Sequence, residues 1–83
     1  MQSNTIHEKI KVAAVFDGNK VLPKWFYWGR NKHLIQKVEH IWQSKEGETK
    51  ILCFAVTDGA NVFEIRLNQK TLEWVLETVY QEG

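Results

Sequence analysis

The chain has 83 residues, enough for one domain with a thin core, because a domain of this size keeps a high surface-to-volume ratio. Its hydrophobic and charged fractions, 43% and 25%, are ordinary for a globular protein and argue against disorder. The net charge of +1 argues against a global attraction to nucleic acid, and no apolar run, residues 12–16 included, is long enough to span a membrane.

The single cysteine and the polar N-terminus bear on the compartment. Cys53 has no partner for an internal disulfide, which fits a reducing environment. Residues 1–10 are polar and do not have the apolar segment of a signal peptide. We therefore expect a cytoplasmic protein with one domain over residues 1–83, of which residues 1–8 form a frayed N-terminus.

The first two expected strands are residues 9–16 and 24–28. In the first, apolar residues alternate with lysines before a turn at residues 17–19. In the second, Trp25 and Tyr27 point to one face and Phe26 and Trp28 to the other, so both faces are aromatic. Pro23 is expected at the entry of this strand, where a missing N–H group costs least. Residues 29–31 form the next turn.

The third and fourth runs cover residues 32–42 and 50–57. Alternation fails in the third, where Ile35, Val38 and Ile41 are spaced by three, and this spacing predicts a β-bulge or a strong bend, with a helix as the alternative. A polar loop over residues 44–48 follows. The fourth run is apolar on both faces, which is typical of a central strand covered on both sides. Asp58 and Gly59 then give the clearest hairpin turn of the chain.

The last two runs are residues 62–67 and 71–80. In the former, Phe63, Ile65 and Leu67 are expected inward, with Glu64 and Arg66 outward. The latter fits either a helical stripe or a strand with three inward residues, namely Leu72, Trp74 and Leu76. Strand is favoured because the preceding connection has hairpin length. These runs predict an all-β fold, a strongly curved antiparallel meander sheet or small barrel of about six strands.

Charge is unevenly divided along the chain. Residues 1–43 hold seven Lys and Arg against three acids, and residues 44–83 hold four against seven. The fold can separate these charges into a basic and an acidic face or interleave them across strands. Within the basic half, residues 24–33 alternate aromatic and basic side chains. This segment supplies the candidate binding residues Trp25, Tyr27, Trp28, Arg30, Lys32 and His33.

No motif of catalysis or metal binding is recognisable. His7, His33 and His40, with Cys53, are the residue types of a zinc site, but their spacing has no tight ligand pair. Cys53 lies in an apolar run, the setting of an unreactive buried thiol. We expect no enzyme activity, no metal and no cofactor.

The pattern of aromatic, apolar and turn residues in this chain resembles that of a group of small uncharacterised bacterial β-domains. A similar domain closes the C-terminus of ImuB-like Y-family DNA polymerase homologues. The resemblance covers about residues 9–80 and is carried by Pro23, Phe26, Trp28, Gly29, Arg30, Ile35, Val38, Trp42, Thr57, Asp58, Gly59, Thr71, Trp74 and Leu76. In that family the Trp and the Gly-Arg pair are often separated by one more residue. The resemblance implies an accessory binding module, with DNA repair as one context, and it favours a strand for the last segment.

We therefore expect an interaction module that binds a protein partner or a second copy of itself through an aromatic and basic sheet face. The alternative is that the same face binds single-stranded nucleic acid, since bases stack on exposed rings and cations follow the phosphates.

Overall fold

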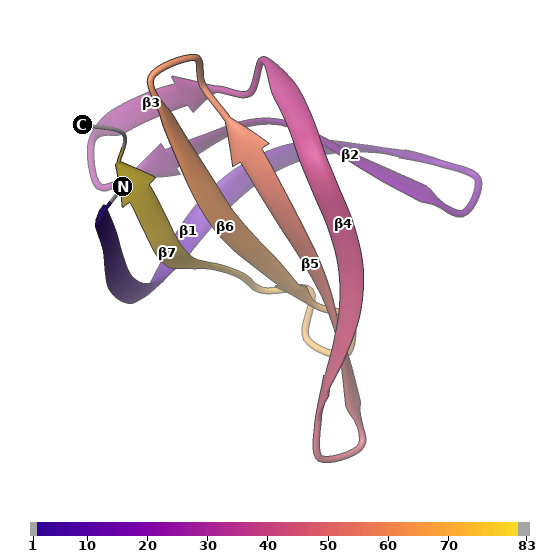
Figure 1. Cartoon of the computed structure of the whole chain (residues 1–83). Coiled ribbons are helices and arrows are strands. Elements are labelled where there is room, and N and C mark those ends of the chain that lie inside the picture. The colour runs from indigo at the N-terminus through magenta and orange to yellow at the C-terminus, as the bar shows by residue number, and fades with distance from the viewer. Residues whose placement is uncertain (1, 82–83) are drawn as a thin grey trace.

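The computed structural model describes residues 2–81, which form seven antiparallel strands and no helix (Figure 1). The all-β antiparallel prediction is confirmed, and the helical alternatives for residues 32–42 and 71–80 are wrong. The strands are β1 (Gln2–Asp17), β2 (Lys20–Trp28), β3 (Asn31–Leu34), β4 (Lys37–Glu46), β5 (Thr49–Thr57), β6 (Asn61–Asn68) and β7 (Trp74–Gln81). No helix in this described part is long and apolar enough to cross a membrane.

The strands form one sheet in the order β3-β2-β1-β7-β6-β5-β4, so the two edge strands are consecutive in the chain. The sheet curls strongly, because the Phe26 ring of β2 contacts the Phe63 ring of β6 at 5.1 Å between centroids, although β1 and β7 lie between these strands. No ladder joins β3 to β4, so of the two predicted forms the structure has the curved meander sheet and not the closed barrel. Residues 35 and 36 link the two edge strands along the chain.

This bridging link is where the expected third strand breaks. The amide of Ile35 donates to the carbonyl of Lys24 in β2, and the amide of Gln36 donates to the carbonyl of Thr57 in β5. One continuous run therefore pairs first with one sheet edge and then with the other. The predicted bend and the predicted bulge both occur, the latter as a register shift between Val38 and His40.

The core lies inside the curl and is built from side chains that alternate along the strands. Period-two alternation places Phe63, Ile65 and Leu67 of β6 in the core, as predicted, whereas Glu64, predicted outward, is also buried. A large cluster of buried residues fills the interior, consisting of Phe26, Phe54, Val56, Phe63, Ile65, Leu67, Trp74, Leu76 and Val79. At β5 the opposite face is buried as well, through Ile51 and Cys53, as predicted from its two apolar faces, although β5 lies beside the edge strand β4 and not at the centre of the sheet.

Three local expectations need correction. Residues 2–8, expected to be frayed, pair with β7 from Gln2 opposite Gln81 onward, which also brings the two ends of the described chain together (Figure 1). Pro23 lies within β2 rather than at its entry, at a register shift between Ala13 and Ala14. Leu72 lies in the β6–β7 loop with a positive φ of 64° and is exposed, so it does not face the core.

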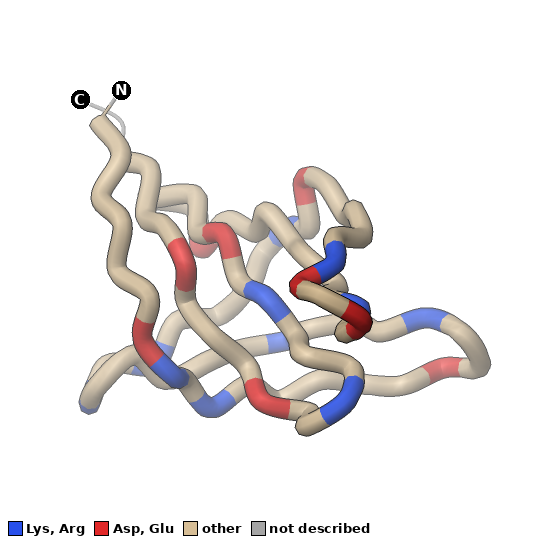
Figure 2. Tube along the Cα trace, turned by 90° about the horizontal axis from the view of Figure 1, so that it is seen from below, with Lys and Arg blue, Asp and Glu red and all other residues tan. Residues whose placement is uncertain are grey.

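The charged residues are only partly sorted. Figure 2 shows both signs of charge spread along the trace, and Lys9 bonds to Glu73 at 3.0 Å between Nζ and Oε2. Interleaving therefore accounts for much of the sequence asymmetry. The strands β1, β2 and β3 nevertheless share a face on which the balance of positive and negative charges is different.

Candidate binding surface

The outer face of β1, β2 and β3 presents aromatic and basic side chains in cross-strand rows. One row places Tyr27 between Lys11 and Lys32, and the next places Trp25 between Ala13 and Leu34. Val15 continues the face along β1 beside Leu22. We call this surface the outer platform, made of Lys11, Ala13, Val15, Leu22, Trp25, Tyr27, Lys32 and Leu34.

The platform keeps large rings in contact with water. Trp25 and Tyr27 are 37% and 41% exposed, and Leu34 is 60% exposed. Phe26, which lies between the two aromatic residues in the sequence, is fully buried. The alternation of β2 explains this, because only one of its two aromatic faces can join the core of a single curled sheet. Monomeric proteins seldom leave a contiguous apolar patch to solvent without a partner for it.

The charges on the platform are all positive. Within the described residues, neither Lys11 nor Lys32 is ion-paired, and no carboxylate occurs in the rows that carry Trp25 and Tyr27. The Lys32 ammonium lies 4.7 Å from the centroid of the Trp25 ring, a cation–π contact. The platform therefore combines ring faces with cations that are available to an anionic ligand.

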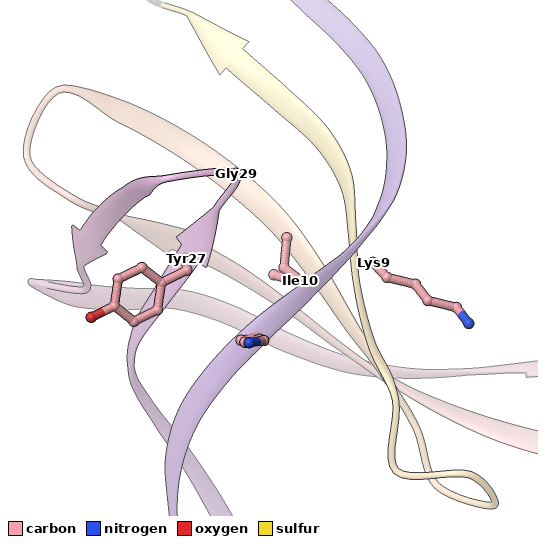
Figure 3. Close-up of a pocket in the computed structure, with 5 residues that line it drawn as sticks. Lys9, Ile10, Tyr27 and Gly29 are labelled. Atoms are coloured by element: carbon pink, nitrogen blue, oxygen red, sulfur yellow. The ribbon is translucent and has the colours of Figure 1, made fainter.

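A shallow hollow of about 510 Å³ adjoins the Tyr27 ring (Figure 3). Lys9, Ile10, Lys11 and Gly29 complete its wall. Gly29 has a φ of 60° in the tight turn between β2 and β3, a left-handed conformation that favours glycine, and a Cβ there would meet nothing within 4 Å. The turn thus leaves this side of the ring open.

The structure divides the six predicted binding residues between two faces. Trp25, Tyr27 and Lys32 lie together on the platform, and Arg30 is exposed in the adjoining turn. Trp28 packs against the core, and its indole Nε1 donates to Glu8 Oε2 at 3.1 Å. His33 also faces the interior. Sequence reasoning missed Lys11 and Leu34, which only the strand register places beside the rings.

His33 is held inside by an aromatic cluster and by Asp58. Its ring stacks on Phe26 and contacts Phe63, each at 5.0 Å between centroids. The Nδ1 atom lies 3.0 Å from Asp58 Oδ2, while Nε2 is buried without a hydrogen-bond partner among residues 2–81. Since an ionised carboxylate can only accept, Nδ1 donates in this contact. The pair joins β3 to the β5–β6 turn.

Asp58 also organises that turn. Its Oδ1 accepts hydrogen bonds from the backbone amides of Ala60 and Asn61. Burial alone would raise the pKa of Asp58, but the Asn61 amide, the His33 ring and the Ala60 amide outweigh burial and lower the pKa. The carboxylate is therefore ionised at neutral pH, and both of its oxygens accept hydrogen bonds.

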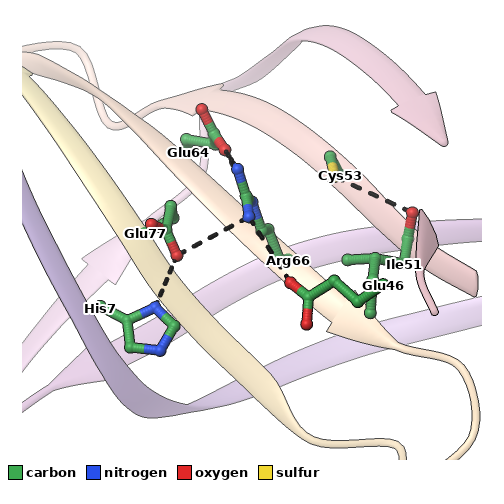
Figure 4. Close-up of polar contacts among 7 residues, drawn as sticks. All are labelled: His7, Glu46, Ile51, Cys53, Glu64, Arg66 and Glu77. Atoms are coloured by element: carbon green, nitrogen blue, oxygen red, sulfur yellow. Dashed lines mark hydrogen bonds and ion pairs between the residues drawn. The ribbon is translucent and has the colours of Figure 1, made fainter. Parts of the chain in front are cut away.

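A second polar group, the Arg66 cluster, lies on the outer face of β6 and consists of His7, Glu46, Glu64, Arg66 and Glu77 (Figure 4). Arg66 bonds to Glu64 at 2.8 Å, and Glu77 also accepts from His7 at 2.8 Å. Cys53 is buried on the same side, opposite Arg66 in the β5–β6 register. Among the described residues, no three His, Cys, Asp or Glu side chains are grouped to hold a metal ion.

Burial makes the Cys53 thiol unreactive. Desolvation raises the pKa of the Cys53 thiol despite the opposing charge of Arg66, so the nucleophilic thiolate is scarce. We expect a disulfide reagent to label the native protein at pH 8 at least about 100-fold more slowly than the chain unfolded in urea, because labelling needs an opening of the sheet. Absorbance of the released thiolate measures both rates, and equal rates would contradict the burial of Cys53.

Comparison with known proteins adds no relative to these observations. No protein-family model matches the chain, and no curated protein or solved structure is significantly similar to it. The resemblance to the polymerase C-terminal domains thus gains no support from them. The fold defines the class of the protein as a small domain with one curled antiparallel meander sheet.

Proposed function

We propose that this protein is a non-catalytic interaction module that binds an acidic macromolecule through the outer platform. The observation that carries the proposal is the exposure of Trp25 and Tyr27 in rows that contain lysines and no carboxylate. Rings supply a large contact area at a low entropic cost, and unpaired cations attract and orient an acidic partner. An acidic protein surface, including that of a second copy of the chain, has this chemistry, and so does single-stranded nucleic acid.

The groups with catalytic potential support a binding role because the fold already engages them. The His33–Asp58 pair points into the aromatic interior, and the Cys53 thiol is buried. A general base must reach a substrate proton, and a thiol nucleophile must be exposed as thiolate. The side chains left accessible on the platform instead offer stacking, apolar contact and charge.

Elution from immobilised heparin, a generic polyanion, tests the charge of the platform. Reversing two platform charges in the double variant Lys11→Glu/Lys32→Glu should lower the salt concentration needed for elution, because ionic binding to a polyanion depends on the number of cations in contact. The matched control is Lys45→Glu/Lys50→Glu, which makes the same change in net charge at the tip of the β4–β5 hairpin, away from the platform (Figure 1).

The proposal requires the platform variant to elute clearly earlier than the control variant. Light scattering of the eluted peaks reports the molar mass, so that self-association through the platform is detected as well. If both variants elute together and the native mass is that of a monomer, the platform is not a binding face for acidic molecules.

A further inference from the structure

We infer that the outer platform binds single-stranded nucleic acid, with one unpaired base stacked on Tyr27 in the adjoining hollow. This inference rests on the proposed function and names its ligand. Tyr27, Ile10 and Lys9 all line the hollow, and Figure 3 shows the Tyr27 ring on the side of Ile10, with the Lys9 side chain pointing away from the ring. A volume of about 510 Å³ lies within the range of small-molecule sites.

The charges around the hollow suit a phosphate backbone. Lys11 borders the hollow and, with Lys32, flanks Tyr27 on either side in the cross-strand row. Arg30 is exposed in the turn at the end of the same hairpin. Lys9 also lines the hollow but bonds to Glu73, so Lys11 is its free cation among the described residues. Cations on both sides of an exposed ring let a base stack while its phosphates remain neutralised.

The rings favour an unpaired strand over a duplex. Trp25 and Tyr27 are two residues apart on one strand, so their positions differ by roughly 6.6 Å along it. Successive bases of a single strand can stack on such neighbouring rings, whereas the bases of a duplex are already stacked on one another. Lys32 lies over the Trp25 ring in the unbound protein and can turn toward a phosphate when a base takes its place.

The same rows disfavour a protein as the main ligand. Lysine is depleted in the centres of protein–protein interfaces because its ammonium group is costly to dehydrate. Here Lys11 and Lys32 border the Tyr27 ring directly on its two sides, so a protein that covers this ring must dehydrate both ammonium groups. A ligand with a negatively charged backbone and planar groups can contact the lysines and stack on the ring at the same time.

Fluorescence anisotropy of a labelled 15-nucleotide oligothymidine, titrated with the whole protein at low salt, tests the inference. We expect binding that weakens as salt is raised, and about 5- to 160-fold weaker binding for Tyr27→Ala, since a stacked base contributes roughly 1–3 kcal/mol. Tyr27→Phe keeps the ring and should bind like the native protein. Lys11→Glu/Lys32→Glu should reduce the slope of log K against log salt by about 1.4, or 0.7 for each lost phosphate contact.

Three results would overturn the inference. These are no binding of oligothymidine or oligouridine at low salt, equal affinity for a blunt duplex of the same length, and unchanged affinity of Tyr27→Ala. A polyglutamate peptide in the same titration separates the two proposals: if the peptide binds and the oligonucleotides do not, the platform remains an acidic-partner site and only the nucleic-acid inference fails. Lys45→Glu/Lys50→Glu, with its charges away from the platform, is expected to retain most of the binding.

Discussion

Replacing Phe26 with alanine is expected to lower the free energy of unfolding by about 3–5 kcal/mol, the usual cost of removing a large buried aromatic side chain. Phe26 is fully buried and packs against Phe63 from across the curl and against His33 from β3. A chain of 83 residues is stabilised by roughly 4–12 kcal/mol in total. The substitution should therefore remove much of the stability, as measured by urea denaturation followed by tryptophan fluorescence.

The neighbouring residue supplies the control. Tyr27 lies on the same strand but points to the platform, so Tyr27→Ala should change the free energy of unfolding by less than about 1 kcal/mol. The contrast between adjacent positions measures which face of β2 is the core face. Equal losses at the two positions would mean that the platform is covered, for instance by a second copy, and that Tyr27 is buried in solution.

Part of this fold can be predicted from the local alternation of apolar and polar residues. Apolar and charged side chains alternate over residues 63–67, so the inward set Phe63, Ile65 and Leu67 follows from a period of two. Residues 50–57 are apolar on both faces, and their sequence predicts a strand without showing which face joins the core. Residues 24–28 show the limit of that rule. Aromatic residues on both faces leave open which face joins the core, and only the curl that brings Phe26 onto Phe63 decides it.

The parts that could not be predicted depend on contacts distant in sequence. Pairing of residues 2–10 with the last strand needs β7 beside β1, and the polar N-terminus carries no local sign of it. Leu72 fits the apolar pattern of its run, but the turn that Asn68 organises by accepting from the Lys70 and Thr71 amides places Leu72 outside. The His33–Asp58 contact joins residues 25 positions apart, so the sequence around either residue does not predict the contact.

Asp58→Ala is expected to cost about 2–4 kcal/mol of stability at pH 7. The variant loses the two amide contacts of the turn and leaves a buried imidazole nitrogen of His33 without its acceptor. Asp58→Asn is the matched variant, because its side-chain oxygen can still accept from the backbone amides while the negative charge is gone. Its loss should be smaller, and the difference between the variants isolates the turn contacts.

The contribution of Asp58 also depends on pH in a defined direction. Its pKa in the folded protein is lowered, so its carboxylate stabilises the fold fully above the unfolded-state pKa of about 3.9. That stabilisation is lost as the pH falls through the lower folded-state pKa. The stability difference between the native protein and Asp58→Asn should thus shrink as the pH falls from about 4 toward 3. A difference that does not shrink in this range would contradict the lowered pKa of Asp58.

The largest local effect of Asp58→Ala should appear at the side of the sheet that no ladder closes. There the two edges are joined by the Ile35 and Gln36 amides and by the His33–Asp58 contact, which lies in the same turn region as the carbonyl of Thr57. Without that contact, the β2–β3 hairpin can separate from the β5–β6 turn without unfolding the remaining ladders. Hydrogen exchange should therefore accelerate at the Ile35 and Gln36 amides more than at the central strand β6. Uniform acceleration over all strands would mean that the two edges open only when the whole domain unfolds.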